Sequence, residues 1–171
     1  MLELENPALD QVIAGFEYSY AIKPLLHQLK YQSVRGIGRY LGDLLYCTTP
    51  LPPLDLIAAI PLHPKRQADR GFNQAQEIAR QLSAHLGVAY IPLTRRLRAS
   101  VSQASIRSRQ QRLKNLEGMF GLVKSAPPLT GKTVLLVDDV CTTGTTLNEC
   151  AKILKAAGAN KVIGLVVAHG N

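Results

Sequence analysis

Residues 134–146 constrain the fold more than any other part of the sequence. This segment starts with four aliphatic residues, continues with two aspartates and ends in a threonine-rich turn around Gly144. A continuous aliphatic run predicts a strand that is buried on both faces. A helix follows, since the next apolar residues recur at helical spacing and Gly158 is placed for a left-handed C-terminal cap. This order predicts an α/β fold with ligand-binding groups at the carboxyl end of the strand.

The residue types in the turn indicate a phosphate site. Residues 142–146 would bring backbone N–H groups and hydroxyls to the N-terminus of the helix. Two carboxylates beside a phosphate would repel it, by about 1 kcal/mol per charge pair at 4 Å in water and by more when partly buried. The arrangement is favourable if Asp138 and Asp139 accept hydrogen bonds from hydroxyls or face a divalent cation. A phosphorylated sugar with a free diol meets both requirements.

This segment resembles the 5-phosphoribosyl-1-pyrophosphate (PRPP) motif of type I phosphoribosyltransferases. The resemblance implies an α/β fold whose mainly parallel sheet is flanked by helices. It also implies that Asp138 and Asp139 bind the ribose hydroxyls and are the candidate catalytic groups. Mg²⁺ would reach the site bound to PRPP, with no metal ligand supplied directly by the protein. The 5′-phosphate would be bound by the turn residues Thr142, Thr143, Gly144, Thr145 and Thr146.

A second candidate anion site follows an earlier apolar run, which predicts a strand over residues 56–60. The loop over residues 61–74 is rich in basic side chains, and Asn73 at its end is placed to cap the next helix. In phosphoribosyltransferases the corresponding loop binds pyrophosphate. The resemblance therefore places three basic residues on the pyrophosphate side, namely Lys65, Arg66 and Arg70.

Further blocks of sequence narrow the resemblance. Residues 70–74 are similar to the ComF/GntX-like group of phosphoribosyltransferase-type proteins, which is associated with natural competence and DNA uptake. Residues 29–31 with Arg35 match the same group, as does a spaced set formed by Arg96, Gln103, Arg112, Asn115 and Phe120. Many members begin with a four-cysteine zinc ribbon that this sequence does not contain. Zinc is therefore not expected as a cofactor.

A basic block occupies the middle of the chain. Residues 78–116 contain eight Lys or Arg and no Asp or Glu, within a chain of formal net charge +8. Such a field attracts a pyrophosphate-bearing ligand or nucleic acid. Residues 99–108 resemble the flexible loop that closes over PRPP, although a solvated basic loop without a chemical role fits equally well. The flexible-loop candidates are Gln103, Arg107, Arg109 and Arg112.

The same block, over residues 95–114, is a candidate site for single-stranded DNA. Its basic side chains would contact the phosphates, and such binding depends strongly on salt. Aromatic residues make up only 5% of the chain, with no tryptophan, so few side chains are available to stack on bases. The low aromatic content is evidence against a dedicated nucleic-acid-binding module, although PRPP binding and DNA binding can coexist.

The length of 171 residues predicts one domain, with an N-terminal helical portion over residues 1–50 and a PRPP-binding core over residues 55–171. Apolar spacing predicts one helix over residues 9–31, interrupted at Pro24, and another over residues 37–46. Two more strands are predicted over residues 119–123 and 161–167. No apolar run is long enough to span a membrane and no leader pattern is present, so we expect a cytoplasmic protein. The scattered cysteines are typical of reduced thiols.

Three functions remain consistent with these residues. The first is a PRPP-binding protein of the ComF type that acts in natural competence on incoming single-stranded DNA, with PRPP, DNA and competence-machinery proteins as partners. The second is a nucleobase-salvage phosphoribosyltransferase. The third is a non-catalytic nucleic-acid-binding module on the same fold. No residue identifies an acceptor, so transfer of the ribosyl group stays open.

Overall fold

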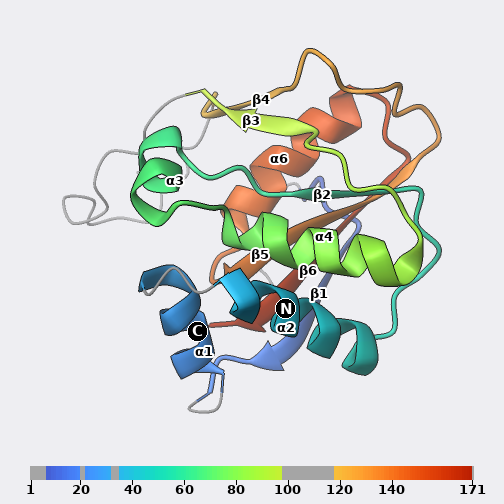
Figure 1. The fold of residues 1–171 in the computed structure, drawn as a ribbon. Helices are drawn as coiled ribbons and strands as arrows, with labels where there is room; N and C mark the ends of the chain where they lie inside the picture. The colour runs from blue at the N-terminus through green and yellow to red at the C-terminus, as the bar shows by residue number, and fades with distance from the viewer. Residues whose placement is uncertain (1–6, 20–21, 32–34, 98–117, 171) are drawn as a thin grey trace.

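The computed structural model describes residues 7–19, 22–31, 35–97 and 118–170. The main sheet contains four parallel strands in the order β1-β6-β5-β2 (Figure 1). A parallel bridge between Ile57 and Tyr90 adds a further backbone segment beyond β2. The strands of the main sheet are β1 (Gln11–Glu17), β2 (Leu56–Ala59), β5 (Thr133–Cys141) and β6 (Lys161–His169). The predicted parallel α/β sheet is confirmed.

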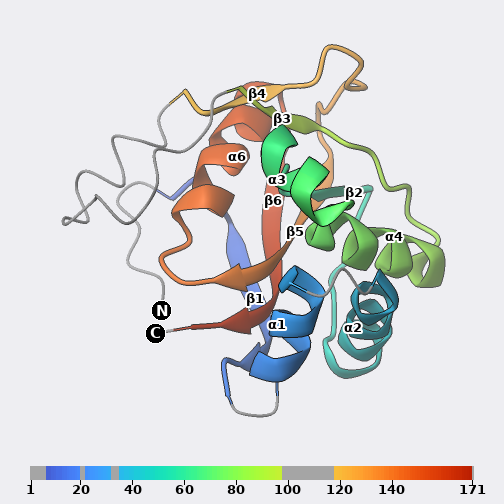
Figure 2. The same ribbon diagram turned by 60° about the vertical axis from the view of Figure 1, so that its left-hand side comes forward.

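Helices cover both faces of this sheet (Figure 2). One face carries α1 (Lys23–Tyr31), α2 (Arg35–Thr48) and α4 (Gln74–Leu86). The other face carries α6 (Thr145–Ala156), with a small antiparallel pair beside it that consists of β3 (Thr94–Arg96) and β4 (Phe120–Leu122). The aliphatic run of β5 serves both layers, because Val134 and Leu136 pack toward α6 while Leu135 and Val137 pack toward α4.

Two glycines let α2 and α4 pack closely. A Cβ on Gly38 would lie 2.7 Å from the Cβ of Glu77, and one on Gly42 would lie 2.6 Å from the Cβ of Gln81. Real Cβ atoms do not approach this closely, so a side chain at either position would force the helices apart. The short distance between α2 and α4 therefore depends on glycine at positions 38 and 42.

The predicted helix over residues 9–31 is wrong in its first half. Gln11–Glu17 forms the edge strand β1, which pairs in parallel with β6. The helix begins only at Lys23, so Pro24 lies in its first turn, where proline is tolerated, and does not interrupt it. The apolar residues around Val12 and Phe16 are compatible with a helix and with a strand, and pairing with β6 makes this segment a strand. The N-terminal portion therefore contributes a strand to the core sheet and is not purely helical.

Other predicted elements are confirmed within a few residues. They are α2, β2, α4, β4, α6, β6 and the left-handed Gly158, which has a φ of 99°. One helix is missed, since the loop over residues 61–74 contains α3 (Pro64–Arg70). The strand β4 pairs with β3 outside the main sheet. None of the helices in the described ranges is long and apolar enough to cross a membrane.

Candidate functional site

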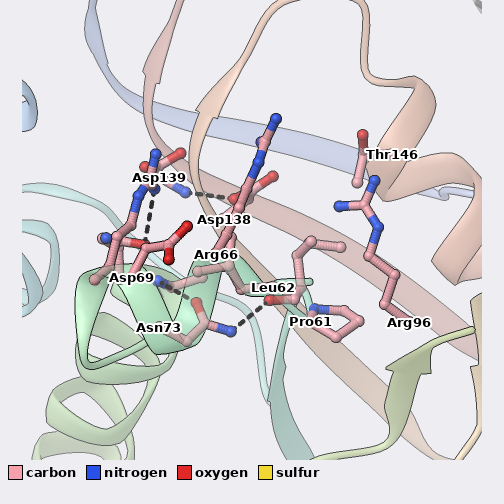
Figure 3. Close-up of a pocket in the computed structure, with 13 residues that line it drawn as sticks. Pro61, Leu62, Arg66, Asp69, Asn73, Arg96, Asp138, Asp139 and Thr146 are labelled. Atoms are coloured by element: carbon pink, nitrogen blue, oxygen red, sulfur yellow. Dashed lines mark hydrogen bonds between the residues drawn. The ribbon is translucent and has the colours of Figure 1, made fainter. Parts of the chain in front are cut away.

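The two candidate loops meet because β2 and β5 are neighbours. These strands pair in parallel, from Leu56 opposite Val134 to Ala59 opposite Val137. The loops that follow them therefore leave the sheet at the same edge. At this edge lies a cleft of about 770 Å³ (Figure 3). Its walls come from the segment after β2, from α3 and the start of α4, from β3, from the end of β5 and from the first turn of α6. Loops that are far apart in the sequence thus form one concave site.

Asp138 and Asp139 lie within β5, which continues to Cys141 and is longer than the predicted strand. Asp138 pairs with Val166 of β6, and its Oδ1 accepts a hydrogen bond of 2.8 Å from the backbone N–H of Asp139. Both side chains are half-buried and both line the cleft. The strand backbone therefore restrains the carboxylate of Asp138 before any ligand arrives.

The threonine turn forms a smaller pocket beside these carboxylates. Gly144 occupies the N-cap position of α6 with a φ of 73°, and no side chain in the described ranges caps this helix. The first N–H groups of α6 are thus available to an anion. The hydroxyls of Thr143 and Thr145 lie 2.8 Å apart. The pocket, of about 50 Å³, is lined by all five predicted residues of the turn and shares Asp138 and Thr146 with the larger cleft.

The basic residues predicted on the pyrophosphate side lie on α3. Arg66 and Arg70 line the cleft together with Asp69, whereas Lys65 is exposed and is not among the lining residues. His63 is the N-cap of this helix, and its Nδ1 accepts a hydrogen bond of 3.2 Å from the backbone N–H of Lys65. Of the three predicted basic residues, the structure brings two to the cleft.

Asn73 ties the wall of the cleft to the sheet. Its Oδ1 accepts a hydrogen bond of 3.0 Å from the N–H of Ala75, which confirms the predicted N-cap of α4. Its Nδ2 donates a hydrogen bond of 2.9 Å to the carbonyl of Ile60, directly after β2. The Nη1 of Arg70 donates a hydrogen bond of 3.3 Å to Oε1 of Gln74, the first residue of α4. The turn between α3 and α4 is therefore held to the end of β2.

Arg96 is a cleft residue that sequence reasoning matched only to the family pattern. It lies on β3, and Figure 3 shows its guanidinium group extending into the cleft on the side of Thr146. Burial lowers the pKa of Arg96, and the positive charge of Arg66 lowers this pKa further. Its Nε is buried with no hydrogen-bond partner in the described ranges, and its guanidinium carbon lies 5.4 Å from the centre of the Phe120 ring. A partly buried cation that faces a second cation is poised for an anionic ligand.

The arginines of the cleft and the two carboxylates of β5 come from different walls, while Asp69 adds a further carboxylate on α3. The guanidinium groups of Arg66, Arg70 and Arg96 come from α3 and β3, while Asp138 and Asp139 come from β5. Within the described ranges, no group of three His, Cys, Asp or Glu side chains could hold a metal ion.

Cys141, at the end of β5, is 4% exposed. Burial, together with the negative charge of Asp138, raises the pKa of its thiol to about 11. The thiol is therefore neutral near neutral pH, which fits a packing role and not a nucleophilic one. The flexible-loop candidates Gln103, Arg107, Arg109 and Arg112 lie outside the described residues.

A family model described as "Phosphoribosyl transferase domain" matches residues 68–171. The chain belongs to this phosphoribosyltransferase family. The matched region begins on α3 and includes β5, the threonine turn and α6. Both the carboxylates and the small pocket therefore lie inside the family match, whereas β1, β2 and the first two helices precede it.

Curated relatives of this phosphoribosyltransferase-family chain carry competence and DNA-utilization names. "Competence protein F" of Haemophilus influenzae is 31% identical over 92% of this chain and 72% of its own length. "DNA utilization protein YhgH" of Escherichia coli K12 is 32% identical over 91% of this chain and 70% of its own length. "Competence protein ComFC" of Streptococcus pneumoniae is 37% identical over 87% of this chain and 64% of its own length. These relatives confirm the predicted ComF/GntX-like group.

Solved structures show the same fold at lower identity. An adenine phosphoribosyltransferase superposes with a TM-score of 0.50 at 17% identity, over 85% of this chain and 75% of that chain. An allosteric regulatory enzyme of purine biosynthesis superposes with a TM-score of 0.53 at 21% identity, over 78% of this chain and 26% of that chain. At these identities the likeness extends to the fold alone. It confirms the predicted type I phosphoribosyltransferase fold.

Proposed function

We propose that this chain binds PRPP with Mg²⁺ and acts in natural competence, in the handling of incoming single-stranded DNA. The observation that carries the proposal is the meeting of the basic α3 wall, the two carboxylates of β5 and the threonine turn at one edge of the sheet. The competence and DNA-utilization names of the relatives support the biological part.

The shape of the site suits the three parts of PRPP. The small pocket would take the 5′-phosphate on the N–H groups at the start of α6. The ribose diol would donate hydrogen bonds to Asp138 and Asp139, which avoids the repulsion between carboxylates and phosphate. The pyrophosphate would lie toward Arg66, Arg70 and Arg96, whose planar guanidinium groups suit phosphate oxygens. Each group of the ligand thus meets side chains of matching chemistry.

Transfer of the ribosyl group is the enzymatic extension of this proposal. The carboxylates of Asp138 and Asp139 would stabilise positive charge that develops at the ribose C1, and the arginines would stabilise negative charge on the departing pyrophosphate. Bound Mg²⁺ would add charge neutralisation at the pyrophosphate. The protein would then be a glycosyltransferase that passes the ribosyl group to an acceptor.

Titration calorimetry tests ligand binding directly. We expect a Kd of about 1 mM or lower for PRPP with Mg²⁺, weaker binding of ribose 5-phosphate, and weaker binding of PRPP when Mg²⁺ is removed with EDTA. The absence of both heat and a thermal shift with PRPP and Mg²⁺ would contradict the proposed ligand. A screen for pyrophosphate release across nucleobases then separates the enzymatic alternatives. Release with one base indicates salvage, and no release with any base indicates a non-catalytic role.

Binding of single-stranded DNA has its own test. The formal net charge of +8 and the names of the relatives favour this partner. Because phosphate contacts release counterions, the logarithm of the affinity should fall linearly with the logarithm of salt concentration, by about 0.7 per neutralised phosphate. Fluorescence anisotropy with a labelled oligonucleotide measures this slope. An affinity that does not change between low and moderate salt would rule out the electrostatic contact.

A further inference from the structure

Two contacts join the N-terminal helices to the turn between α3 and α4. Arg35, the first residue of α2, donates a hydrogen bond of 2.7 Å from Nη2 to the carbonyl of Gly71. Gln74, which is 2% exposed, donates a hydrogen bond of 3.4 Å from Nε2 to the carbonyl of Leu29 on α1. Neither Arg35 nor Leu29 lines the cleft. Residues outside the cleft therefore hold the segment that follows its basic wall.

The position of α3 depends on this kind of support. None of its residues, Pro64–Arg70, is buried, so the helix has little packing of its own. It ends at Gly71, which has a left-handed φ of 75° and whose N–H donates a hydrogen bond of 2.8 Å to the carbonyl of Gln67. Phe72 follows and is 4% exposed. The C-terminal end of α3 is thus fixed to the core at Phe72.

Arg35 contacts both of these residues. Besides its hydrogen bond to Gly71, its guanidinium carbon lies 5.5 Å from the centre of the Phe72 ring, within the range of a cation–π interaction. One planar group therefore restrains the carbonyl that ends α3 and covers the side chain that anchors it. Lysine would keep the charge and one donor but lose the flat contact with the ring.

We propose that Arg35 is a positioning residue for the anion site. By restraining Gly71 and Phe72, it keeps Arg66 and Arg70 on α3 at the right distance from Asp138 and Asp139. The inference rests on the proposed function, because it assigns to Arg66 and Arg70 the pyrophosphate end of PRPP. It predicts that Arg35 affects the pyrophosphate end of the ligand and not the ribose 5-phosphate end, which contacts β5 and α6.

The variants are Arg35→Met and Arg35→Lys, with Arg39→Met as the matched control. Arg39 is an exposed arginine on the next turn of α2, outside the cleft. We expect Arg35→Met to weaken binding of Mg-pyrophosphate and of PRPP with Mg²⁺ by about 5- to 30-fold, because displaced groups bind poorly. Binding of ribose 5-phosphate should stay within about twofold of the unmodified chain. Arg35→Lys should restore part of the loss, and Arg39→Met should bind as the unmodified chain does.

Hydrogen exchange on the ligand-free protein tests the positioning without any ligand. In Arg35→Met the amides of Gln67 and Gly71 should exchange faster, while that of Gly87, which ends α4, should not change. Unchanged exchange at Gln67 and Gly71 would overturn the proposal. So would an equal loss of affinity for pyrophosphate and ribose 5-phosphate, which indicates general damage. If the unmodified chain binds none of these probes, the proposed function fails while the exchange result still decides the role of Arg35.

Discussion

At the scale of single residues, five of the six aspartates of this chain fall into two groups. Asp10, Asp43 and Asp55 accept hydrogen bonds that join separate elements. Asp138 and Asp139 instead line the cleft from the end of β5. The first group holds the fold together, and the second presents carboxylates to a ligand. Substitutions should therefore separate stability from binding.

The double substitution Asp138→Asn with Asp139→Asn should abolish PRPP binding. Each charge-assisted hydrogen bond from a diol is worth about 1.5–3 kcal/mol, so the loss of both carboxylates should weaken binding by at least about 100-fold. Asp55→Asn is the control, because Asp55 lies at the opposite edge of the same strand pair. Calorimetry measures the affinity, and circular dichroism shows whether the fold is retained. Normal binding by the double variant would refute the diol assignment.

Arg96→Met should weaken PRPP binding with little loss of stability. The partly buried guanidinium has a buried Nε without a hydrogen-bond partner in the described ranges and is repelled by Arg66, whereas methionine keeps an apolar stem beside Phe120. We expect PRPP binding to weaken by about tenfold and the free energy of unfolding to fall by no more than about 0.5 kcal/mol. Arg95→Met, at the exposed neighbouring position on β3, should leave PRPP binding unchanged. A large loss of stability in Arg96→Met would show that Arg96 is structural.

At the scale of elements, the contact between α2 and α4 positions residues at the wall of the cleft. α4 carries Asn73 at its N-cap and Gln74 in its first turn, both at the wall of the cleft. α2 carries Arg35, which restrains Gly71. Because Gly38 and Gly42 allow the two helices to approach closely, their packing distance also sets where these polar residues lie.

Gly42→Ala should destabilise the protein by about 1–3 kcal/mol, since the added Cβ would overlap the side chain of Gln81 and the carbonyl of Ile78. Gly36→Ala is the matched control on the same helix, because nothing lies within 4 Å of a Cβ built there. Alanine is the better helix former, so Gly36→Ala should be neutral or stabilising by up to about 1 kcal/mol. Urea unfolding measures both variants. Equal effects of the two substitutions would show that the helix contact is not tight.

At the scale of the whole molecule, the two edges of the sheet have different roles. The carboxyl edge carries the cleft. At the amino edge, Asp10 precedes β1 and accepts a hydrogen bond of 2.7 Å from the N–H of Val162 on β6. In the same way, Asp55 precedes β2 and accepts a hydrogen bond of 2.8 Å from the N–H of Thr133 on β5. Aspartates thus join neighbouring strands at the edge opposite the cleft.

Acid should weaken this edge. Burial raises the pKa of Asp10, but hydrogen bonds from Lys155 and Val162 outweigh it, so the pKa is lowered overall. A lowered pKa in the folded state stabilises the protein above the unfolded pKa of 3.8, and this stability is lost as pH falls through the folded value. Asp10→Asn should therefore lose about 0.5–1 kcal/mol at neutral pH, after allowance for solvent screening, and show a shallower decline in acid.

Thermal unfolding between about pH 3 and pH 7 measures this dependence, with Glu17→Gln at the end of β1 as the control. The difference between the unmodified chain and the Asp10→Asn variant should shrink as pH falls, because protonation of Asp10 removes its charge. A constant difference between them across the range would show that the hydrogen bonds and not the charge carry the effect.

The sequence by itself determined the central strand, the threonine turn, α6 and the chemistry expected of their side chains. Four aliphatic residues in a row indicate a strand inside a sheet that is covered on both faces. A glycine-containing turn before an amphipathic helix leaves the first N–H groups of that helix available to an anion. It also determined the family, since the motifs of residues 70–74 and 134–146 are local patterns. Such features depend on neighbouring residues, so they can be recognised without the fold.

Tertiary structure alone decided the rest. Gln11–Glu17 is a strand because β6 lies beside it, although its residues also suit a helix. Arg96 lines the cleft because β3 packs beside α6. Arg35 supports the cleft because α2 packs beside the turn after α3. These relations join residues far apart in the chain, where sequence spacing carries no information about distance. The register between β2 and β5 is what turns two separate loops into one site.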